Sequence, residues 1–314
     1  MSEADAPAHV PVLVEQVCAL AGAGSHSVVV DGTLGMGGHA EALLTRLPDI
    51  ELYIGMDRDP EAIRRATARL ARFDGRVRIA HATFDQAPEV MEAAGVRAAG
   101  FILLDLGVSS YQLDTAERGF SFQADGPVDM RMDPTTGMTA IELIQRTPVA
   151  ELEALLRDRG DVVCPGRVAK ALFEHRQRIK TTGDLARVVS DALPAPAKRG
   201  LKIHPATLTF MALRSAVNRE PEMLKAALPA LIERLSLGGR LAVISFHSLE
   251  DRVVKQVMQA EARGCVCPPA FPVCTCGKKP RITLDNKRSK AAESAEVDAN
   301  PRSRSARLRV AVRK

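Results

Sequence analysis

Three aspartates end short hydrophobic runs of the sequence and are the first candidates for chemistry. Asp31, Asp57 and Asp105 each directly follow residues rich in Val, Ile and Leu. Buried parallel strands are hydrophobic almost throughout, and α/β proteins bind ligands beyond the carboxyl ends of such strands. One acid of this kind is typical of a helix cap or a surface group. Three on separate strands, together with glycines, favour a shared ligand site.

A glycine-rich segment after Asp31 indicates which ligand this site holds. Its glycines would let the backbone approach a ligand closely. Their spacing supplies neither the G-x-G-x-x-G of dinucleotide sites nor the G-x-x-x-x-G-K-[ST] of phosphate-binding loops. We therefore predict a nucleoside cofactor without phosphate, S-adenosylmethionine. Asp57 would accept from the ribose hydroxyls, Phe84 would lie against adenine, and Asp105 would lie beside the methyl donor. The predicted cofactor residues are Asp31, Gly35, Gly37, Gly38, Asp57, Phe84 and Asp105.

Alternating strands and helices must position these residues. Residues 28–105 alternate four apolar strands with helices, which predicts a parallel sheet covered on both faces. Residues 111–204 contain helical patterns and no convincing strand, and the α/β pattern then resumes. We predict an α/β fold with a Rossmann-like sheet. Its discontinuous domain would span residues 1–110 and 205–314, interrupted by an all-helical insertion over 111–204.

Local sequence patterns predict where individual helices and strands of this fold begin and end. Residues 139–159 read as helical, and Gly238-Gly239 would end a helix that begins at Glu222. Thr181 is a plausible N-cap because Asp184 follows three residues later, and Ser248 is another because Asp251 follows it at the same spacing. Residues 308–312 alternate like a closing edge strand. The polar segment 286–305 is expected to be loose.

The positive charge of the chain is concentrated at its end. The net charge is +5, yet residues 278–314 carry 12 Lys and Arg against 4 Asp and Glu, a net of +8. The preceding 277 residues therefore carry 31 basic and 34 acidic groups, a net of −3. A tail of this charge is suited to binding a polyanion. The alternative is a tail that contacts only solvent.

Four of the six cysteines fall within twelve residues, as Cys265, Cys267, Cys274 and Cys276. Nothing in the sequence suggests secretion, so we do not expect a disulfide framework. The Cys-x-Cys spacing is tighter than that of most zinc sites, and no histidine joins the group. We predict a thiol-rich loop without a metal, and zinc binding is the alternative.

Long motifs of the chain resemble the ribosomal RNA small-subunit methyltransferase H family. The resemblance runs from about His9 to the C-terminus. The motifs are His9-Val10-Pro11-Val12-Leu13, Asp31-Gly32-Thr33-Leu34-Gly35-Met36-Gly37-Gly38-His39, Asp57-Arg58-Asp59-Pro60-Glu61-Ala62, Asp105-Leu106-Gly107-Val108-Ser109-Ser110, Arg118-Gly119-Phe120-Ser121-Phe122, Asp129-Met130-Arg131-Met132-Asp133, His204-Pro205-Ala206-Thr207, Ser245-Phe246-His247-Ser248-Leu249-Glu250-Asp251-Arg252 and Asn300-Pro301-Arg302-Ser303-Arg304-Ser305-Ala306.

This resemblance implies a class I S-adenosylmethionine-dependent methyltransferase fold with a helical insertion. It implies N4-methylation of a cytidine in the P-site region of the 16S rRNA decoding centre. Its cofactor contacts add His39 and Gln112 to the residues named above. The chain departs from the family pattern at Thr147, at Gly160-Asp161 and at Met211, in or beside the insertion. These departures affect the expected RNA contacts rather than the chemistry.

The chemistry implied needs a group that accepts a proton or hydrogen bond from the cytosine amine. Asp105 is the first candidate, and His247 is a second because histidine titrates near neutrality. A purely structural role for His247 is the alternative. Amino-methyltransferases of DNA usually carry [DSN]-P-P-[YF] at this strand end, whereas Asp105 is followed by Leu106-Gly107-Val108. The aromatic clamp of that motif must therefore come from elsewhere or be absent. The resemblance implies 16S rRNA in the small ribosomal subunit, and not DNA, as the partner.

Recognition of RNA should depend on phosphate contacts, because only 4% of the residues are aromatic and none is Trp. The predicted RNA-binding residues are basic residues of the insertion: Arg167, Lys170, Arg176, Arg178, Lys180, Lys198, Arg199 and Lys202. A solvated helix face is the alternative for each.

No apolar run reaches the length of a membrane span and the first residues lack a signal sequence, so we expect a cytoplasmic protein without a membrane partner. Two other functions stay open at this point. One is a nicotinamide-dependent oxidoreductase, which the glycine spacing disfavours. The other is a non-catalytic rRNA-binding protein.

Overall fold

The computed structural model describes residues 11–24, 27–201, 203–265, 267, 273, 275–285 and 289–314. Lys202, Cys274 and the motif residues His9 and Val10 lie outside the described residues. The chain divides into two compact units. The first comprises Met1–Gly107 and Glu222–Lys314, and the second comprises Val108–Pro221. The second boundary lies beyond the predicted residue 204, because a further helix packs within the second unit.

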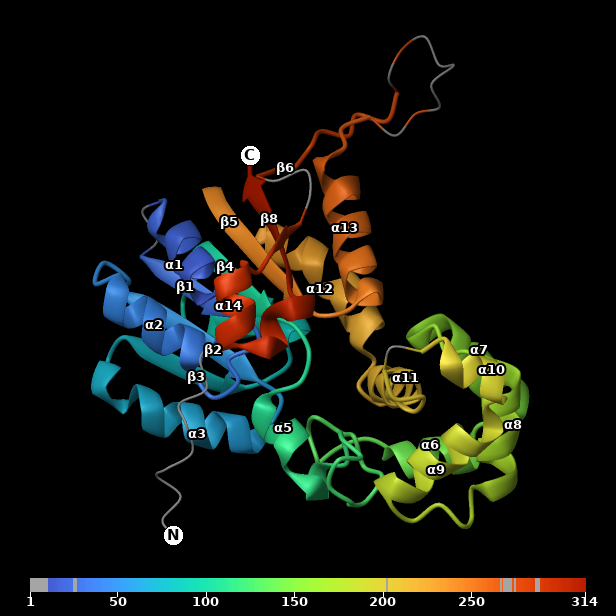
Figure 1. Ribbon diagram of the computed structural model, residues 1–314. Coiled ribbons are helices and arrows are strands. Elements are labelled where there is room, and N and C mark those ends of the chain that lie inside the picture. The colour runs from blue at the N-terminus through green and yellow to red at the C-terminus, as the bar shows by residue number, and fades with distance from the viewer. Residues whose placement is uncertain are drawn as a thin grey trace. The chain divides into compact units, whose positions relative to one another are not determined.

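The first unit is built on one twisted sheet with mostly parallel strands (Figure 1). The strands lie in the order β3-β2-β1-β4-β5-β8-β6, with β7 paired to β8. Strands β1 to β5 are mutually parallel, and β8 is antiparallel to β5, β6 and β7. Their bounds are β1 (Val28–Asp31), β2 (Leu52–Asp57), β3 (Val77–His81), β4 (Ala99–Asp105), β5 (Leu235–Ser245), β6 (Ile282–Leu284), β7 (Lys290–Ala291) and β8 (Arg307–Arg313). The predicted doubly wound α/β fold is confirmed, with its switch in strand order between β1 and β4.

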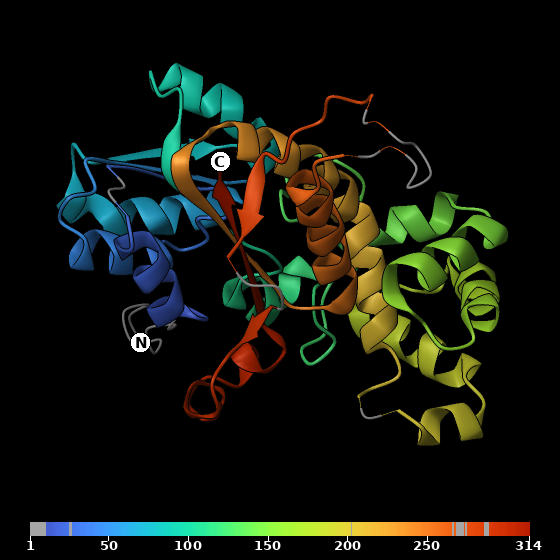
Figure 2. The ribbon, with the colours of Figure 1, turned by 90° about the horizontal axis from the view of Figure 1, so that it is seen from above.

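Helices cover both faces of this sheet (Figure 2). Successive strand residues point to opposite faces, so Val29 packs with α1 (Val14–Gly22), α2 (Gly38–Arg46) and α3 (Pro60–Leu70), and Val30 packs on the other side. The helices on that other side are α4 (Ala87–Ala93), α12 (Glu220–Glu233) and α13 (Ser248–Ala262). Burial on both faces explains why the central strands are hydrophobic throughout.

Several predicted boundaries in this unit are wrong. Gly238 and Gly239 lie inside β5, where the pairing with β4 shifts register, because Gly238 adopts a φ of 76° that suits a bulge. Strand β8 is interior, since β6 and β7 pair with its outer edge. The segment expected to be loose contains α14 (Ser294–Ala299) and the 3-10 helix η4 (Pro301–Ser305).

The second unit is helical. Among its described residues the only β pairing is an isolated bridge between Pro127 and Thr181. Its helices are α5 (Ser110–Asp114), α6 (Ala140–Arg146), α7 (Val149–Gly160), α8 (Pro165–His175), α9 (Thr182–Ala192), α10 (Ala195–Arg199) and α11 (Thr207–Val217). Pro148 separates α6 from α7, so the prediction of one continuous helical stretch over residues 139–159 is wrong. Thr181 caps α9 through a capping box with Asp184, as its spacing indicates. The unit has its own hydrophobic core.

In the part of the chain that the structure describes, no helix combines the length and apolar character needed to cross a bilayer.

Candidate functional site

The glycine-rich loop after β1 is tied to the ends of the neighbouring strands. Gly35 N–H donates to Asp57 Oδ2 at 2.8 Å, and Leu34 N–H donates to the carbonyl of Met56 at 2.9 Å. Gly35 and Gly37 have φ values of 53° and 79°, which glycine adopts without the strain that a side chain would add. The loop therefore bends back over the carboxyl end of β2 and delivers the chain into α2.

Asp57 is half-buried at the end of β2, beside this loop. Its Oδ1 accepts the N–H of Asp59 at 2.9 Å, so the chain engages both carboxylate oxygens through backbone donors. Burial raises the pKa of Asp57, and these two hydrogen bonds oppose the rise. Each oxygen still has a lone pair with which to accept from a ligand hydroxyl.

Asp31 ends β1 and is 1% exposed. Tyr53 Oη donates to its Oδ2 at 2.8 Å, and Thr33 N–H donates to its Oδ1 at 3.0 Å. Burial raises the pKa of Asp31 to about 6, while nearby His39 and the Tyr53 hydrogen bond lower it. These contacts make Asp31 a support for the first turn of the loop. Its predicted direct contact with cofactor stays a prediction.

Asp105 ends β4, the strand beside β1, and its side chain lies next to His39 of α2. Thr33 Oγ1 accepts the backbone N–H of Asp105 at 2.6 Å, and His39 Nε2 lies 3.5 Å from Asp105 Oδ2. Asp105 Oδ1 and both ring nitrogens of His39 are buried, and none has a hydrogen-bond partner among the described residues. Buried polar atoms are nearly always partnered in proteins. A bound ligand would supply hydrogen-bond partners for these three atoms.

Phe84 lies close to Gly32, the residue at which the glycine-rich loop after β1 begins. Phe84 opens a short 3-10 helix after β3 and is half-buried. A Cβ on Gly32 would lie 2.8 Å from Phe84 Cβ and 2.6 Å from Leu104 Cδ2, so no larger residue fits at position 32 without displacement. The spacing of the glycines does not reveal this role of Gly32, because it depends on Leu104 of β4 and on Phe84, which follows β3.

Gln112, the remaining predicted cofactor residue, belongs to the second unit. It is 5% exposed, and its side-chain Oε1 accepts the N–H of Ser109 in the capping box of α5. Its contact with cofactor therefore stays a prediction.

His247, the second predicted catalytic residue, is the N-cap of α13. Its Nδ1 accepts the N–H of Glu250 at 3.3 Å, and its Nε2 lies 2.9 Å from Glu250 Oε1. Glu250 is itself held by the N–H of Phe246. Because Nδ1 accepts a hydrogen bond, the ring hydrogen of a neutral His247 lies on Nε2, which faces Glu250 Oε1. These contacts favour a positioning role over that of a base. The sequence placed this cap at Ser248, one residue too late.

The predicted RNA-binding residues differ in how accessible they are. Arg167, Lys170, Arg178, Lys180 and Arg199 are exposed, Lys198 is half-buried, and Lys202 lies outside the described residues. Lys170 also pairs with Glu174 at 3.8 Å. Arg176 instead lies over the ring of Phe173, at 3.8 Å from its centroid, and donates to the carbonyl of Phe173. Arg176 is therefore the least suited of the group to reach a phosphate.

Arginines of the basic tail reach the carboxyl edge of the sheet. Strand β8 is antiparallel to β5, which pairs Arg307 with Ser245, the last residue of β5. Arg302 and Arg304 of η4 precede that point and are exposed. Residues 301–307 of the tail thus lie at the edge of the sheet where Asp31, Asp57 and Asp105 also end their strands.

Comparison with known proteins gives consistent results. Residues 6–314 match the MraW methylase family. Ribosomal RNA small subunit methyltransferase H of Geobacter sp. is 47% identical over 304 residues, covering 96% of this chain and 97% of that protein. The protein of the same name from Oleidesulfovibrio alaskensis is 45% identical over 309 residues, covering 98% and 95%. The solved N-methyltransferase NodS of Bradyrhizobium japonicum, in complex with S-adenosyl-L-homocysteine, has a TM-score of 0.41 and 11% identity, covering 96% and 85%. That likeness is too low to add to the family match.

Proposed function

Because the chain belongs to the MraW methylase family, we propose that it methylates the exocyclic N4 of one cytidine in 16S rRNA, in the P-site region of the decoding centre. The family and its close relatives make it a methyltransferase of small-subunit ribosomal RNA that uses S-adenosylmethionine. The base, the atom and the position in the rRNA are the proposed part.

One observation carries the assignment of the site. Asp105 Oδ1 and the ring nitrogens of His39 are buried, without partners among the described residues, at the switch in strand order of a doubly wound sheet. Ligands bind at that switch in folds of this class. Asp57 beside them offers carboxylate oxygens to ribose hydroxyls, and Phe84 offers an aromatic face to adenine. The loop carries no phosphate-binding pattern, so this donor set fits an adenosyl group.

S-adenosylmethionine, when bound, supplies an already activated methyl group on a positively charged sulfur. The protein's task is then to prepare the cytosine amine, whose lone pair is delocalised into the ring. Asp105 accepts one hydrogen of that amine, which favours the tetrahedral nitrogen needed for attack. Holding the amine in line with the methyl group can supply roughly 7–11 kcal/mol.

His247 holds the end of β5 against the start of α13 and is a positioning residue in this proposal. Its Nδ1 accepts from the backbone of Glu250, and its Nε2 faces the carboxylate of Glu250. Acting as a base would require one of these contacts to break. Proton acceptance is therefore assigned to Asp105 alone.

The exposed basic residues of the helical unit, with Arg302 and Arg304 of the first unit, are proposed to bind rRNA phosphates. Phosphate contacts position an RNA without reading its sequence. A base in structured RNA must also be made accessible before its amine can react.

The decisive experiment is mass spectrometry of 16S rRNA from cells with and without the gene, followed by restoration in vitro. The purified protein and S-adenosylmethionine should restore N4-methylcytidine to small subunits from the deletion strain. A methyl group on another base or atom would contradict the proposed specificity. Binding of the subunits without methyl transfer would identify a non-catalytic rRNA-binding protein. Preference for NAD over S-adenosylmethionine in titration would favour the oxidoreductase.

A further inference from the structure

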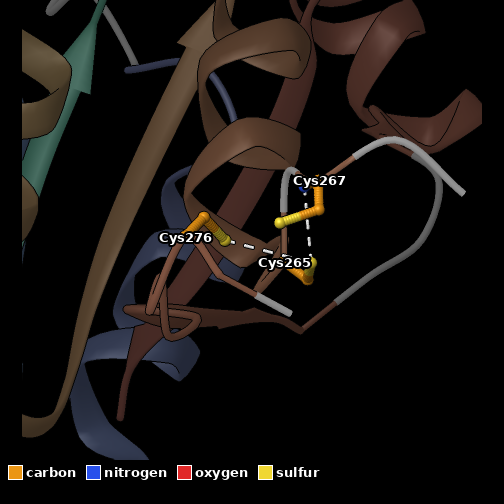
Figure 3. A group of neighbouring side chains, drawn as sticks. All are labelled: Cys265, Cys267 and Cys276. Carbon is orange, nitrogen blue, oxygen red and sulfur yellow. Dashed lines mark hydrogen bonds between the residues drawn. The ribbon is translucent and has the colours of Figure 1, made fainter. Parts of the chain in front are cut away.

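Three cysteines meet in the segment between α13 and β6, on the first unit (Figure 3). The Sγ atoms of Cys265, Cys267 and Cys276 all lie within 4.8 Å of one another. From this geometry we propose that the three thiols bind a structural zinc ion. The sequence predicts a loop without metal, because its Cys-x-Cys spacing is narrower than that of most zinc sites. Folding brings Cys276 against the pair from eleven residues away and so supplies a third ligand that the narrow spacing alone lacks.

The sulfur spacing matches a shared metal better than a disulfide. Zinc binds thiolate sulfur at about 2.3 Å in a tetrahedron, whose sulfur atoms are then about 3.8 Å apart. Cys276 Sγ lies 3.9 Å from Cys265 Sγ. A disulfide needs about 2.05 Å between its sulfurs. Three soft thiolate ligands with no carboxylate or imidazole among them favour zinc over magnesium or calcium.

Hydrogen bonds within the loop prepare the thiols as ligands. The N–H of Cys267 donates to Cys265 Sγ at 3.4 Å, and Thr275 Oγ1 lies 3.7 Å from Cys267 Sγ. The thiolate is the form that binds metal, and donors around the sulfur orient the ligand.

The described residues of the segment have no hydrophobic core of their own. None of the described residues between 263 and 280 is buried, and Val273 is 70% exposed. Its ends are joined, because Arg281 N–H donates to the carbonyl of Glu261 at 2.9 Å and Lys278 Nζ donates to that of Ala260 at 2.8 Å. A metal cross-link is how small segments without a core are stabilised.

The zinc would be structural and separate from the methyltransferase site. Helix α13 begins beside the carboxyl end of β5 and runs for 15 residues before this segment. At 1.5 Å per residue that is about 22 Å. Zinc loss should therefore change stability without changing cofactor affinity, and the proposal does not depend on the substrate of the enzyme.

The test is the zinc content of the full-length protein purified under reducing conditions without chelator. Elemental mass spectrometry should find about one zinc per chain in the wild type. Cys265→Ser, Cys267→Ser and Cys276→Ser should each lose most of it. Cys164→Ser, which alters a cysteine of the helical unit, should keep it. Cys276→His should retain zinc, because imidazole can replace a thiolate as ligand.

Cobalt gives a second readout that does not rely on how the protein was purified. Stripped wild type titrated with Co²⁺ should develop sulfur-to-cobalt charge-transfer absorption and the visible bands of a tetrahedral ion, and the serine variants should not. S-adenosylmethionine affinity shows that each variant is folded. Metal-free wild type without cobalt bands, or an intact mass two hydrogens lighter through a disulfide of these cysteines, would overturn the proposal.

Discussion

Asp31, Asp57 and Asp105 end neighbouring strands, yet the chain surrounds each carboxylate differently. Asp31 is enclosed by Tyr53 and Thr33, and Asp57 accepts two backbone N–H groups. Asp105 keeps a buried oxygen without a partner among the described residues, next to His39. In the proposed function these identical side chains would take three tasks: supporting the loop, holding the cofactor and accepting from the substrate. A separate prediction follows from the role proposed for each aspartate.

Replacing Asp57 should weaken cofactor binding. Asp57→Ala removes the acceptor proposed for the ribose hydroxyls, so the dissociation constant of S-adenosylmethionine should rise by the equivalent of about 1.5–3 kcal/mol. Isothermal titration calorimetry measures it. Asp57→Asn keeps an oxygen for the N–H of Gly35 or Asp59 and should lose less. An unchanged dissociation constant for the alanine variant would refute the ribose role.

Replacing Asp105 should slow transfer far more than it weakens binding. Asp105→Asn keeps the shape of the side chain but is a poorer acceptor for the amine hydrogen, so kcat should fall about 10²- to 10⁴-fold. Single-turnover methylation of unmethylated small subunits measures it, with RNA affinity determined alongside. Equal losses in rate and RNA affinity would make Asp105 a binding residue.

Asp31 should make the stability of the protein depend on pH. Its folded pKa of about 6 lies above the ordinary 3.8, so the folded state holds this proton more tightly than the unfolded chain does. That contribution is complete below pH 4 and is lost as the pH rises through 6. At about 1.4 kcal/mol per pKa unit, the loss is on the order of 3 kcal/mol.

Denaturant unfolding between pH 4 and 7 measures this loss. Asp31→Asn should remove it from the pH profile of the free energy of unfolding, whereas Asp74→Asn, at an exposed aspartate, should leave it in place. Parallel profiles for wild type and Asp31→Asn would show that Asp31 is ionised throughout this range.

At the scale of elements, α8 shows how one helix can serve both core and surface. Val168, Ala169 and Leu172 are buried, while Arg167 and Lys170 are exposed on the same helix. Further basic residues follow in the link to α9, where Arg178 is exposed and Arg176 lies over Phe173. The folded position of Arg176 leaves Arg167 and Arg178 as the better probes of RNA binding.

Charge reversal at these two positions should reduce the salt dependence of RNA binding. Each phosphate contact contributes close to one unit to the slope of log affinity against log salt, so Arg167→Glu with Arg178→Glu should lower it by about 2. Filter binding of small subunits at several salt concentrations measures the slope. Arg157→Glu on α7 is the matched control. An unaltered slope in the double variant would place this face in solvent.

At the scale of the whole molecule, the two units differ in continuity. The first unit comes from two stretches of chain, because its sheet needs β5 beside β4 and β8 beside β5. The second is one continuous stretch, Val108–Pro221, with its own core and an internally capped α9. Local contacts in a continuous chain allow independent folding.

Residues 108–221 should therefore fold alone. Calorimetry of that fragment should show one cooperative transition with an enthalpy of about 80 kcal/mol, from roughly 0.7 kcal/mol per residue. Thr181→Ala, which removes the cap of α9, should lower its free energy of unfolding by about 1 kcal/mol. A fragment that melts without a cooperative transition would show that the second unit needs the first to fold.

The sequence by itself was sufficient for the strands β1 to β4, for the three aspartates at strand ends and for the cap at Thr181. These features follow from neighbouring residues: apolar runs, turn-forming glycines and a hydroxyl three residues before an acid. The family resemblance alone predicted His39 as a cofactor residue, because no local pattern indicates it. In the structure His39 lies buried beside Asp105.

Tertiary structure alone decided contacts that no sequence pattern records, some of them between residues only three apart in the chain. It placed Glu250 against both nitrogens of His247, laid Arg176 over Phe173 and placed Gly238 at a bulge opposite β4. It also brought Cys276 to Cys265, eleven residues away. The reason is physical: periodicity records which face a residue occupies, whereas hydrogen bonds, ion pairs and metal ligation require atoms to meet within a few ångströms, and only the folded chain sets those distances.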